Sequence, residues 1–244
     1  MTRTLIAVAL SVAMLASGCT GRPATAEAPT PVVVLLDRSA STGPVADRYL
    51  TYFRQVTESL QGGERLLVLP VSGASLTAPP AVDLTFPAYR ALTTNAFTHG
   101  RSMKKLRQEA ADAVAALLEQ PPDAASQHTA ILDGLMRAQE LLNGRPGVIC
   151  IISDMVEDSD VVRLDGLTEE QVPAVLAAAA GRAPTTLQGA RIHVAGLDAA
   201  GALPPARVLA IRHFWEQVFA GAGATLEEYG PTFGRLGSGV SQTP

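Results

Sequence analysis

This chain is poor in cysteine and in basic residues, and none of its apolar runs is long enough to cross a bilayer. With 2 cysteines among 244 residues, the fold must rest on its hydrophobic core rather than on a disulfide network. Lys and Arg total 19 against 23 Asp and Glu, and the net charge of −4 gives no indication of nucleic-acid binding. The Gly-x-Ser-x-Gly motif is absent, which excludes a serine hydrolase of the α/β type.

The N-terminus has the layout of a secretory signal. Arg3 precedes an apolar stretch at residues 5–15, which is shorter than the about 20 residues that span a bilayer. The stretch leads into the sequence LASGC at residues 15–19, which resembles the lipobox of bacterial lipoproteins. The resemblance implies cleavage before Cys19 and attachment of lipid to its thiol. The alternative is an ordinary signal peptide, or an uncleaved anchor, with a chance cysteine.

The lipobox interpretation divides the N-terminal region into a signal peptide at residues 1–18 and a lipidated Cys19 with a flexible tether at residues 19–30. The tether is small, polar and rich in proline, a composition typical of disordered linkers. Stable anchoring needs more than one acyl chain, which a lipidated cysteine supplies. We therefore expect a domain anchored in the bacterial cell envelope, either on the outer side of the cytoplasmic membrane or, since residue 20 is Thr rather than Asp, in an outer membrane.

The remaining chain alternates apolar β-type runs with helical patterns. We expect strands at 32–36, 66–71, 81–85, 148–152, 191–197 and 224–229, and helices at 45–60, 103–118, 129–142, 169–180 and 205–222. The last helix should bury Val208, Ile211, Trp215, Val218 and Phe219. This alternation predicts an α/β fold: a doubly wound, mostly parallel sheet with helices on both faces. One domain is expected over 31–229, followed by a loose tail at 230–244.

Oxygen-bearing side chains follow the first expected strand. Asp37, Ser39 and Ser41 lie in the loop that leaves it, and carboxylate and hydroxyl oxygens are the ligands that Mg²⁺ or Mn²⁺ prefers. In open α/β sheets, ligands bind at the carboxyl ends of the strands, where this loop lies. The alternative is that Ser39 or Ser41 caps a helix that begins near Gly43.

Two further residues are expected at the same edge of the sheet. Thr129 opens a helix, and Asp154 directly follows the most apolar strand in the chain. The first and fourth strands tend to flank the switch point of a doubly wound sheet, so these residues should converge with Asp37. Alternatively, Thr129 is a helix N-cap and Asp154 is a solvated loop acid. Two neighbours, His128 and Asp158, are more simply explained as ordinary loop residues.

These positions resemble the metal-ion-dependent adhesion site of von Willebrand factor type A (VWA) domains. The resemblance runs over about residues 31–229 and implies a Mg²⁺ or Mn²⁺ ion held by Asp37, Ser39, Ser41, Thr129 and Asp154. It also implies a protein partner in the envelope or outside the cell that supplies an acidic residue to the metal. One departure is Met155, where glycine is the commoner choice in the family, and its side chain threatens to crowd the site.

The resemblance favours a binding module over an enzyme. A haloacid-dehalogenase-like phosphatase needs a second aspartate two residues after Asp37, and that position is Ser39. A metal-dependent hydrolase therefore ranks below the binding module. A third alternative is a structural VWA-like domain with a vestigial metal site, which acts through other surfaces. The long segment at residues 72–100 is a candidate recognition loop.

Overall fold

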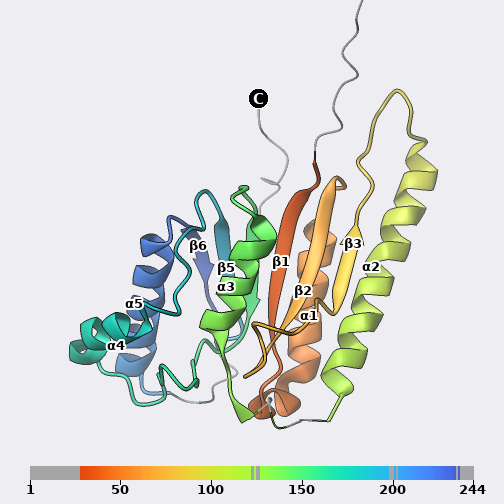
Figure 1. Cartoon of the computed structure of the whole chain (residues 1–244). Helices are drawn as coiled ribbons and strands as arrows, with labels where there is room; N and C mark the ends of the chain where they lie inside the picture. The colour runs from red at the N-terminus through yellow and green to blue at the C-terminus, as the bar shows by residue number, and fades with distance from the viewer. Residues whose placement is uncertain are drawn as a thin grey trace, which may run out of the picture.

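The computed structural model describes residues 28–121, 124, 127–197, 201, 203–234 and 236, without the side chains of residues 40 and 41 (Figure 1). Six strands form one sheet in the order β3-β2-β1-β4-β5-β6. They are β1 (Thr30–Asp37), β2 (Glu64–Val71), β3 (Val82–Thr85), β4 (Val148–Ile152), β5 (Arg191–Ala195) and β6 (Thr225–Tyr229). All neighbours are parallel except β3, which pairs antiparallel with β2 at one edge. Cys19 and the expected signal peptide lie outside the described residues.

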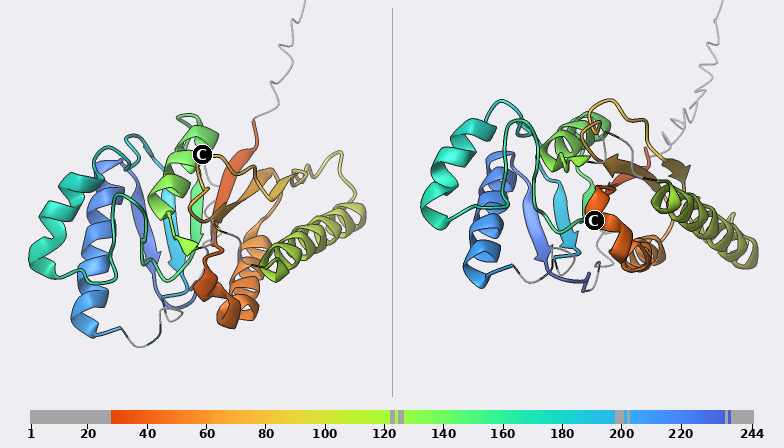
Figure 2. Two further views of the ribbon diagram at one scale, coloured as in Figure 1. Left: turned by 60° about the horizontal axis from the view of Figure 1, so that its bottom comes forward. Right: turned by 90° about the horizontal axis from the view of Figure 1, so that it is seen from below.

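Helices cover both faces of the sheet, as Figure 2 shows from the side of the carboxyl edge. They are α1 (Ala46–Ser59), α2 (Ala96–Glu119), α3 (Ile131–Leu142), α4 (Val172–Ala179) and α5 (Pro205–Gly221), with short 3₁₀ helices η1 (Ala40–Val45) and η3 (Glu169–Gln171). Because side chains alternate along a strand, β1 contributes to two cores. Val33 and Leu35 pack with α3, α4 and α5, whereas Val34 and Leu36 pack with α1 and α2. The predicted doubly wound α/β fold is confirmed.

The switch point lies between β1 and β4, the two strands expected to flank it. From β1 the chain moves to β2 on one side, and from β4 it moves to β5 and β6 on the other. Asp37 ends β1 and Ile152 ends β4, so the loops that follow leave the same edge of the sheet side by side. This adjacency places Asp37 and Asp154 next to each other at the carboxyl edge.

Helix α2 is longer than its apolar periodicity predicts. It begins at Ala96 rather than at residue 103, because Asn95 caps it: its side chain accepts hydrogen bonds from the N–H groups of Phe97 and Thr98. The extra turns are solvent-exposed, so they carry no buried stripe for a periodicity analysis to detect. Among the described residues, no helix is long and apolar enough to span a membrane.

The C-terminal end of the domain departs from two expectations. Val208 is exposed, and Phe214 takes its place in the buried face of α5 beside Trp215. The tail was expected to be loose, yet Phe233 is buried and its ring meets Tyr52 of α1 edge-on, with the ring centroids 6.4 Å apart. The tail segment 230–234 therefore packs on the α1 face, because a buried aromatic ring removes a large apolar area from water.

Candidate metal site

Asp37 is a buried carboxylate held by hydrogen bonds from Ser39, Thr42 and Ser153. Its side chain is only 2% exposed. Oδ1 accepts a hydrogen bond of 2.8 Å from the backbone N–H of Ser39, and Oδ2 accepts one of 2.8 Å from the hydroxyl of Ser153. The hydroxyl of Thr42 lies 3.4 Å from Oδ1 and donates to it. The carboxylate is thus fixed in one orientation at the end of β1.

The loop after β4 is built around Ser153 and Asp154. The Ser153 hydroxyl, besides donating to Asp37, accepts the N–H of Met155 at 3.0 Å. Oδ1 of Asp154 accepts the N–H of Val156 at 2.9 Å. Asp154 is therefore part of a folded turn beside Asp37, which is not the arrangement of a freely solvated loop acid.

Ser39 in the first loop does not cap a helix with its side chain. Ser39 occupies the N-cap position of η1, but its side chain makes no capping hydrogen bond. Its hydroxyl instead lies 3.5 Å from that of Thr42, inside the buried cluster around Asp37. The backbone of Ser41 continues within η1, and its side chain lies outside the described part of the structure. The capping alternative for Ser39 is therefore wrong.

Thr129 is tied to the same loop by its backbone. Its N–H donates to the carbonyl of Asp158 at 3.1 Å, and the N–H of Asp158 donates back at 2.9 Å. This two-bond bridge brings buried Thr129 to the segment that also carries Asp154. The N-cap of α3 is Ala130, so the alternative that Thr129 caps this helix is also wrong.

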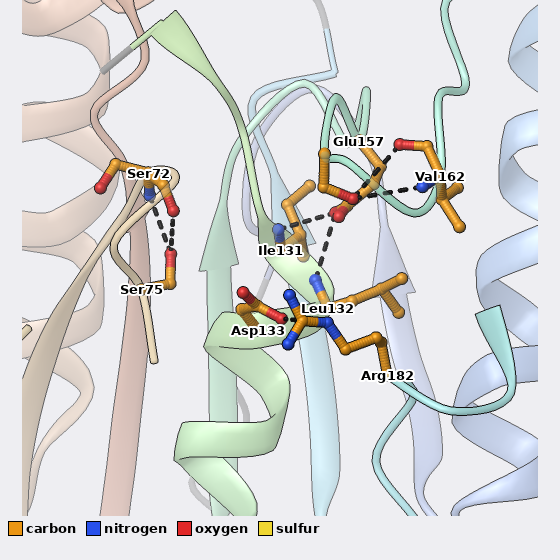
Figure 3. Close-up of polar contacts among 9 residues, drawn as sticks. Ser72, Ser75, Ile131, Leu132, Asp133, Glu157, Val162 and Arg182 are labelled. Atoms are coloured by element: carbon orange, nitrogen blue, oxygen red, sulfur yellow. Dashed lines mark hydrogen bonds and ion pairs between the residues drawn. The ribbon is translucent and has the colours of Figure 1, made fainter. Parts of the chain in front are cut away.

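Glu157 caps α3, the role that the alternative interpretation gave to Thr129 (Figure 3). Its Oε2 accepts the N–H groups of Ile131 at 2.7 Å and of Leu132 at 3.2 Å, the first two residues of α3. The side chain is fully buried, so it does not belong to a solvated acidic loop. A carboxylate at a helix N-terminus satisfies N–H groups that have no partner within the helix and also complements the helix dipole.

Met155 does not crowd the site with its side chain. Its φ of 65° lies in the left-handed region, where glycine is the least strained residue. The side chain is fully buried in the core that contains α3 and α5, and its carbonyl accepts the Trp215 indole N–H at 2.9 Å. The departure from glycine therefore affects the backbone of the loop and its packing.

Burial disfavours the negative charge of the two aspartates at this edge. It raises the pKa of Asp37, against hydrogen bonds from Ser39, Ser153 and Thr42. Burial, together with the charge of Asp37, raises the pKa of Asp154 to about 6. Within the described part of the chain, neither carboxylate forms an ion pair. The buried carboxylate of Asp37 and the partly buried one of Asp154, whose proton affinity Asp37 raises, provide a favourable environment for a cation.

The donor set fits a hard divalent cation. The described residues hold no group of three or more His, Cys, Asp or Glu side chains that could share a metal, so a cation here depends on hydroxyl ligands. Asp37, Ser39, Thr129 and Asp154 supply carboxylate and hydroxyl oxygens at one edge, as Mg²⁺ prefers. Asp158 lies outside this set, because it pairs with Arg163 at 3.1 Å and with His128 at 3.7 Å.

Sequence reasoning missed the supporting role of three residues. Thr42 and Ser153 orient Asp37, and Glu157 fixes the start of α3 next to Thr129. The pattern S/T-D at the end of an apolar strand marks Ser153. No local signal marks Glu157, because its partners lie 25 and 26 residues away.

No protein-family profile matches the chain, and no curated protein resembles it in sequence. Solved structures of similar fold include a von Willebrand factor type A protein from Catenulispora acidiphila (13% identity, TM-score 0.42, 83% of this chain and 39% of that one). Others are the pilus adhesin SpaC from Lactobacillus rhamnosus GG in its open conformation (14%, 0.42, 82% and 28%) and the human COPII-coat protein Sec24c (9%, 0.40, 83% and 29%).

This chain therefore spans between 28% and 39% of the length of those three solved chains. At such low identity the likeness concerns the fold alone. The strand order and the helices on both faces are those of the doubly wound α/β fold that the sequence predicts.

Proposed function

We propose that this chain is a bacterial envelope lipoprotein whose VWA-like domain binds a protein partner through a divalent cation. Asp37, Ser39, Ser41, Thr129 and Asp154 would hold Mg²⁺ or Mn²⁺ at the carboxyl edge of β1 and β4. The observation that carries the proposal is the pair of neighbouring carboxylates, buried Asp37 and partly buried Asp154, without a cationic partner in the described part of the chain.

The protein supplies few negative charges and several hydroxyls to this edge. A bound cation with such ligands keeps enough positive charge to accept a carboxylate from another molecule. Hydrogen bonds from the Ser39 N–H and the Ser153 hydroxyl hold the carboxylate of Asp37 at the edge where the ion would bind. The partner is therefore expected to present an acidic side chain.

We infer a binding role rather than catalysis. The histidines, which would be the natural bases for activating a hydroxyl, contact other groups. His193 pairs with Glu228 at 3.2 Å, and exposed His213 contacts Glu169. His128 lies near Asp158, and His99 stacks on Tyr89. None of these contacts is with the hydroxyl of Thr42 or Ser153, which instead hold Asp37 in place.

Thermal unfolding tests the metal site. The protein would lack residues 1–18 and carry Cys19→Ser, which leaves both cores intact because their residues lie between Val32 and Leu236. In EDTA and then in Mg²⁺ or Mn²⁺, the midpoint should rise. A cation at 100 times its dissociation constant stabilises by about 2.7 kcal/mol.

The rise should vanish in Asp37→Ala and persist in Asp83→Asn, which removes an exposed carboxylate paired with Arg65 on β2. A midpoint that ignores the metal in the parent protein would reject the site and favour a domain that acts through other surfaces. The lipid anchor is tested separately, by incorporation of radiolabelled palmitate into the full chain but not into its Cys19→Ser variant.

A further inference from the structure

Exposed apolar side chains cluster at one end of α2. We call residues 86–105 the α2 tip: the loop after β3 and the first turns of α2. It holds three of the six large apolar side chains that are exposed in the described structure. They are Leu92, exposed over 99% of its surface, Phe97 over 73% and Tyr89 over 48%. Such clustering of apolar groups in water indicates a surface that meets something else.

All charged residues of the same segment are basic. Arg90, Arg101, Lys104 and Lys105 are exposed there, and residues 86–107 contain no Asp or Glu, although the whole chain carries a net charge of −4. The charge order along α2 also runs against helix stability. Acidic residues in the first turn and basic residues in the last turn stabilise a helix. Helix α2 has no acidic residue in its first turn and no basic residue in its last turn. The basic cluster is thus not explained by the stability of the helix.

The α2 tip has a defined shape. The carbonyl of Arg90 accepts the N–H groups of Thr93 and Thr94, which closes the turn that projects Leu92. The guanidinium of Arg101 lies over the ring of Phe97, with its carbon 5.8 Å from the ring centroid. Apolar and cationic groups are therefore interleaved on one ordered surface.

The α2 tip lies at the end of the domain where the chain enters β1. In Figure 1 the N-terminal end of β1 and the loop before α2 both lie at the top, and the carboxyl edge with Asp37 lies at the bottom. Nine residue steps separate Cys19 from Ala28, and at about 3.3–3.6 Å per residue they reach at most about 32 Å. A lipid on Cys19 would therefore hold this end of the domain close to the bilayer.

We propose that the α2 tip docks on an anionic phospholipid surface. Leu92, Phe97 and Tyr89 enter the headgroup region, while Arg101, Lys104 and Lys105 contact lipid phosphates, the arrangement typical of interfacial membrane binding. The orientation rests on the proposed lipid anchor, but the surface itself does not. Docking turns the metal edge away from the membrane, toward a partner. An acidic protein would match the bases but would leave the exposed apolar side chains of Leu92, Phe97 and Tyr89 without a role.

Vesicle co-sedimentation tests the proposal without the lipid or the metal. The unlipidated protein, lacking residues 1–18 and carrying Cys19→Ser, is mixed in EDTA with vesicles of phosphatidylcholine alone or with 30% phosphatidylglycerol added. We expect binding to the anionic vesicles, weakened by salt, and little binding to the neutral ones. Each base near an anionic leaflet contributes about fivefold in affinity, so the triple variant R101E/K104E/K105E should bind at least tenfold more weakly.

One control variant makes the same charge change elsewhere on the domain, and a second removes an exposed apolar side chain elsewhere. R137E/R163E/R212E makes the same change in net charge away from the α2 tip, at exposed Arg163 and Arg212 and half-buried Arg137. Leu209→Ser removes an exposed leucine from α5. Both should retain binding, whereas L92S/F97S should lose most of it. Failure of the parent protein to sediment, or equal sedimentation of the triple variant, overturns the proposal. Neither result bears on the metal site, which is tested by unfolding without vesicles.

Discussion

The hydroxyl of Ser153 donates a 2.8 Å hydrogen bond to Oδ2 of Asp37, and this bond joins the end of β4 to the end of β1. Both residues are buried, so no water replaces the bond if it is lost. The contact links the two loops that would hold the metal, and it sets the orientation of the carboxylate common to them. It connects the stability of the fold to the geometry of the site.

Ser153→Ala should therefore destabilise the protein by about 1–3 kcal/mol, the usual effect of leaving a buried charged acceptor short of a donor. It should also weaken Mg²⁺ binding. Urea unfolding in EDTA measures the first effect, and the metal-induced shift of the midpoint measures the second. Ser75→Ala is the control, because Ser75 is a buried serine whose hydroxyl bonds only locally, to Ser72. Equal loss of metal binding in both variants would contradict the role of Ser153.

Thr129→Ala tests whether the Thr129 hydroxyl binds the metal or caps helix α3. Because Glu157, not Thr129, caps α3, the free energy of unfolding in EDTA should fall by less than the about 1 kcal/mol expected of a lost cap. The metal-induced rise in midpoint should shrink, and Thr129→Ser should restore it. A large loss of stability in EDTA with unchanged metal binding would show that the hydroxyl is structural.

Metal affinity should depend on pH through Asp154. Its pKa is raised to about 6 by burial and by Asp37, and a cation binds the deprotonated carboxylate. The apparent affinity for Mn²⁺ should be constant above about pH 7 and fall roughly tenfold for each unit below pH 6. Titration calorimetry at pH 5, 6 and 7.5 measures it. Asp154→Asn should bind weakly with little dependence on pH, whereas an unchanged profile would assign the titration to another group.

Glu157 should make the metal-free protein less stable at high pH. Burial raises its pKa from 4.5 to about 7, against hydrogen bonds from Ser159, Leu132 and Ile131. The folded state thus holds the proton more tightly than the unfolded state. The contribution of Glu157 to the free energy of unfolding is complete below pH 4.5 and is lost as the pH rises through 7, a change of roughly 3 kcal/mol.

Glu157→Gln removes this titration but keeps an oxygen for the N–H groups of Ile131 and Leu132. Between pH 5 and pH 8, the stability of the parent should fall relative to that of the variant by roughly the same 3 kcal/mol. Denaturant unfolding in EDTA at the two pH values measures the difference. A difference that stays constant would mean that Glu157 is charged throughout.

Met155→Gly should be destabilising even though glycine suits the backbone. Relief of the left-handed conformation gains about 1–2 kcal/mol, but deletion of the buried side chain costs about 2–5 kcal/mol. Met155→Ala keeps the strain and loses the side chain, so it should be the least stable of the three. Equilibrium unfolding gives the order, and an alanine variant more stable than the glycine variant would remove strain from the explanation.

The sequence predicts the strands well because buried parallel strands are short apolar runs with polar ends. Val148–Ile152 is such a run, and its position next to β1 follows from the doubly wound order. That order also places Asp154 beside Asp37. The start of α2 and the capping of α3 are harder to predict. The first depends on an exposed helical segment, and the second on Glu157, which reaches a helix far away in sequence.

Strand β1 lies in the middle of the sheet, with β2 and β4 bonded along its two sides. The chain enters β1 at Thr30, and Asp37 is the last residue of the strand at the opposite end. If the domain is tethered at its N-terminus and held by a partner at the metal, any tension between them runs along this strand. Such a load shears the interstrand hydrogen bonds together instead of opening them one after another. The position of β1 therefore gives the domain a geometry suited to resisting force.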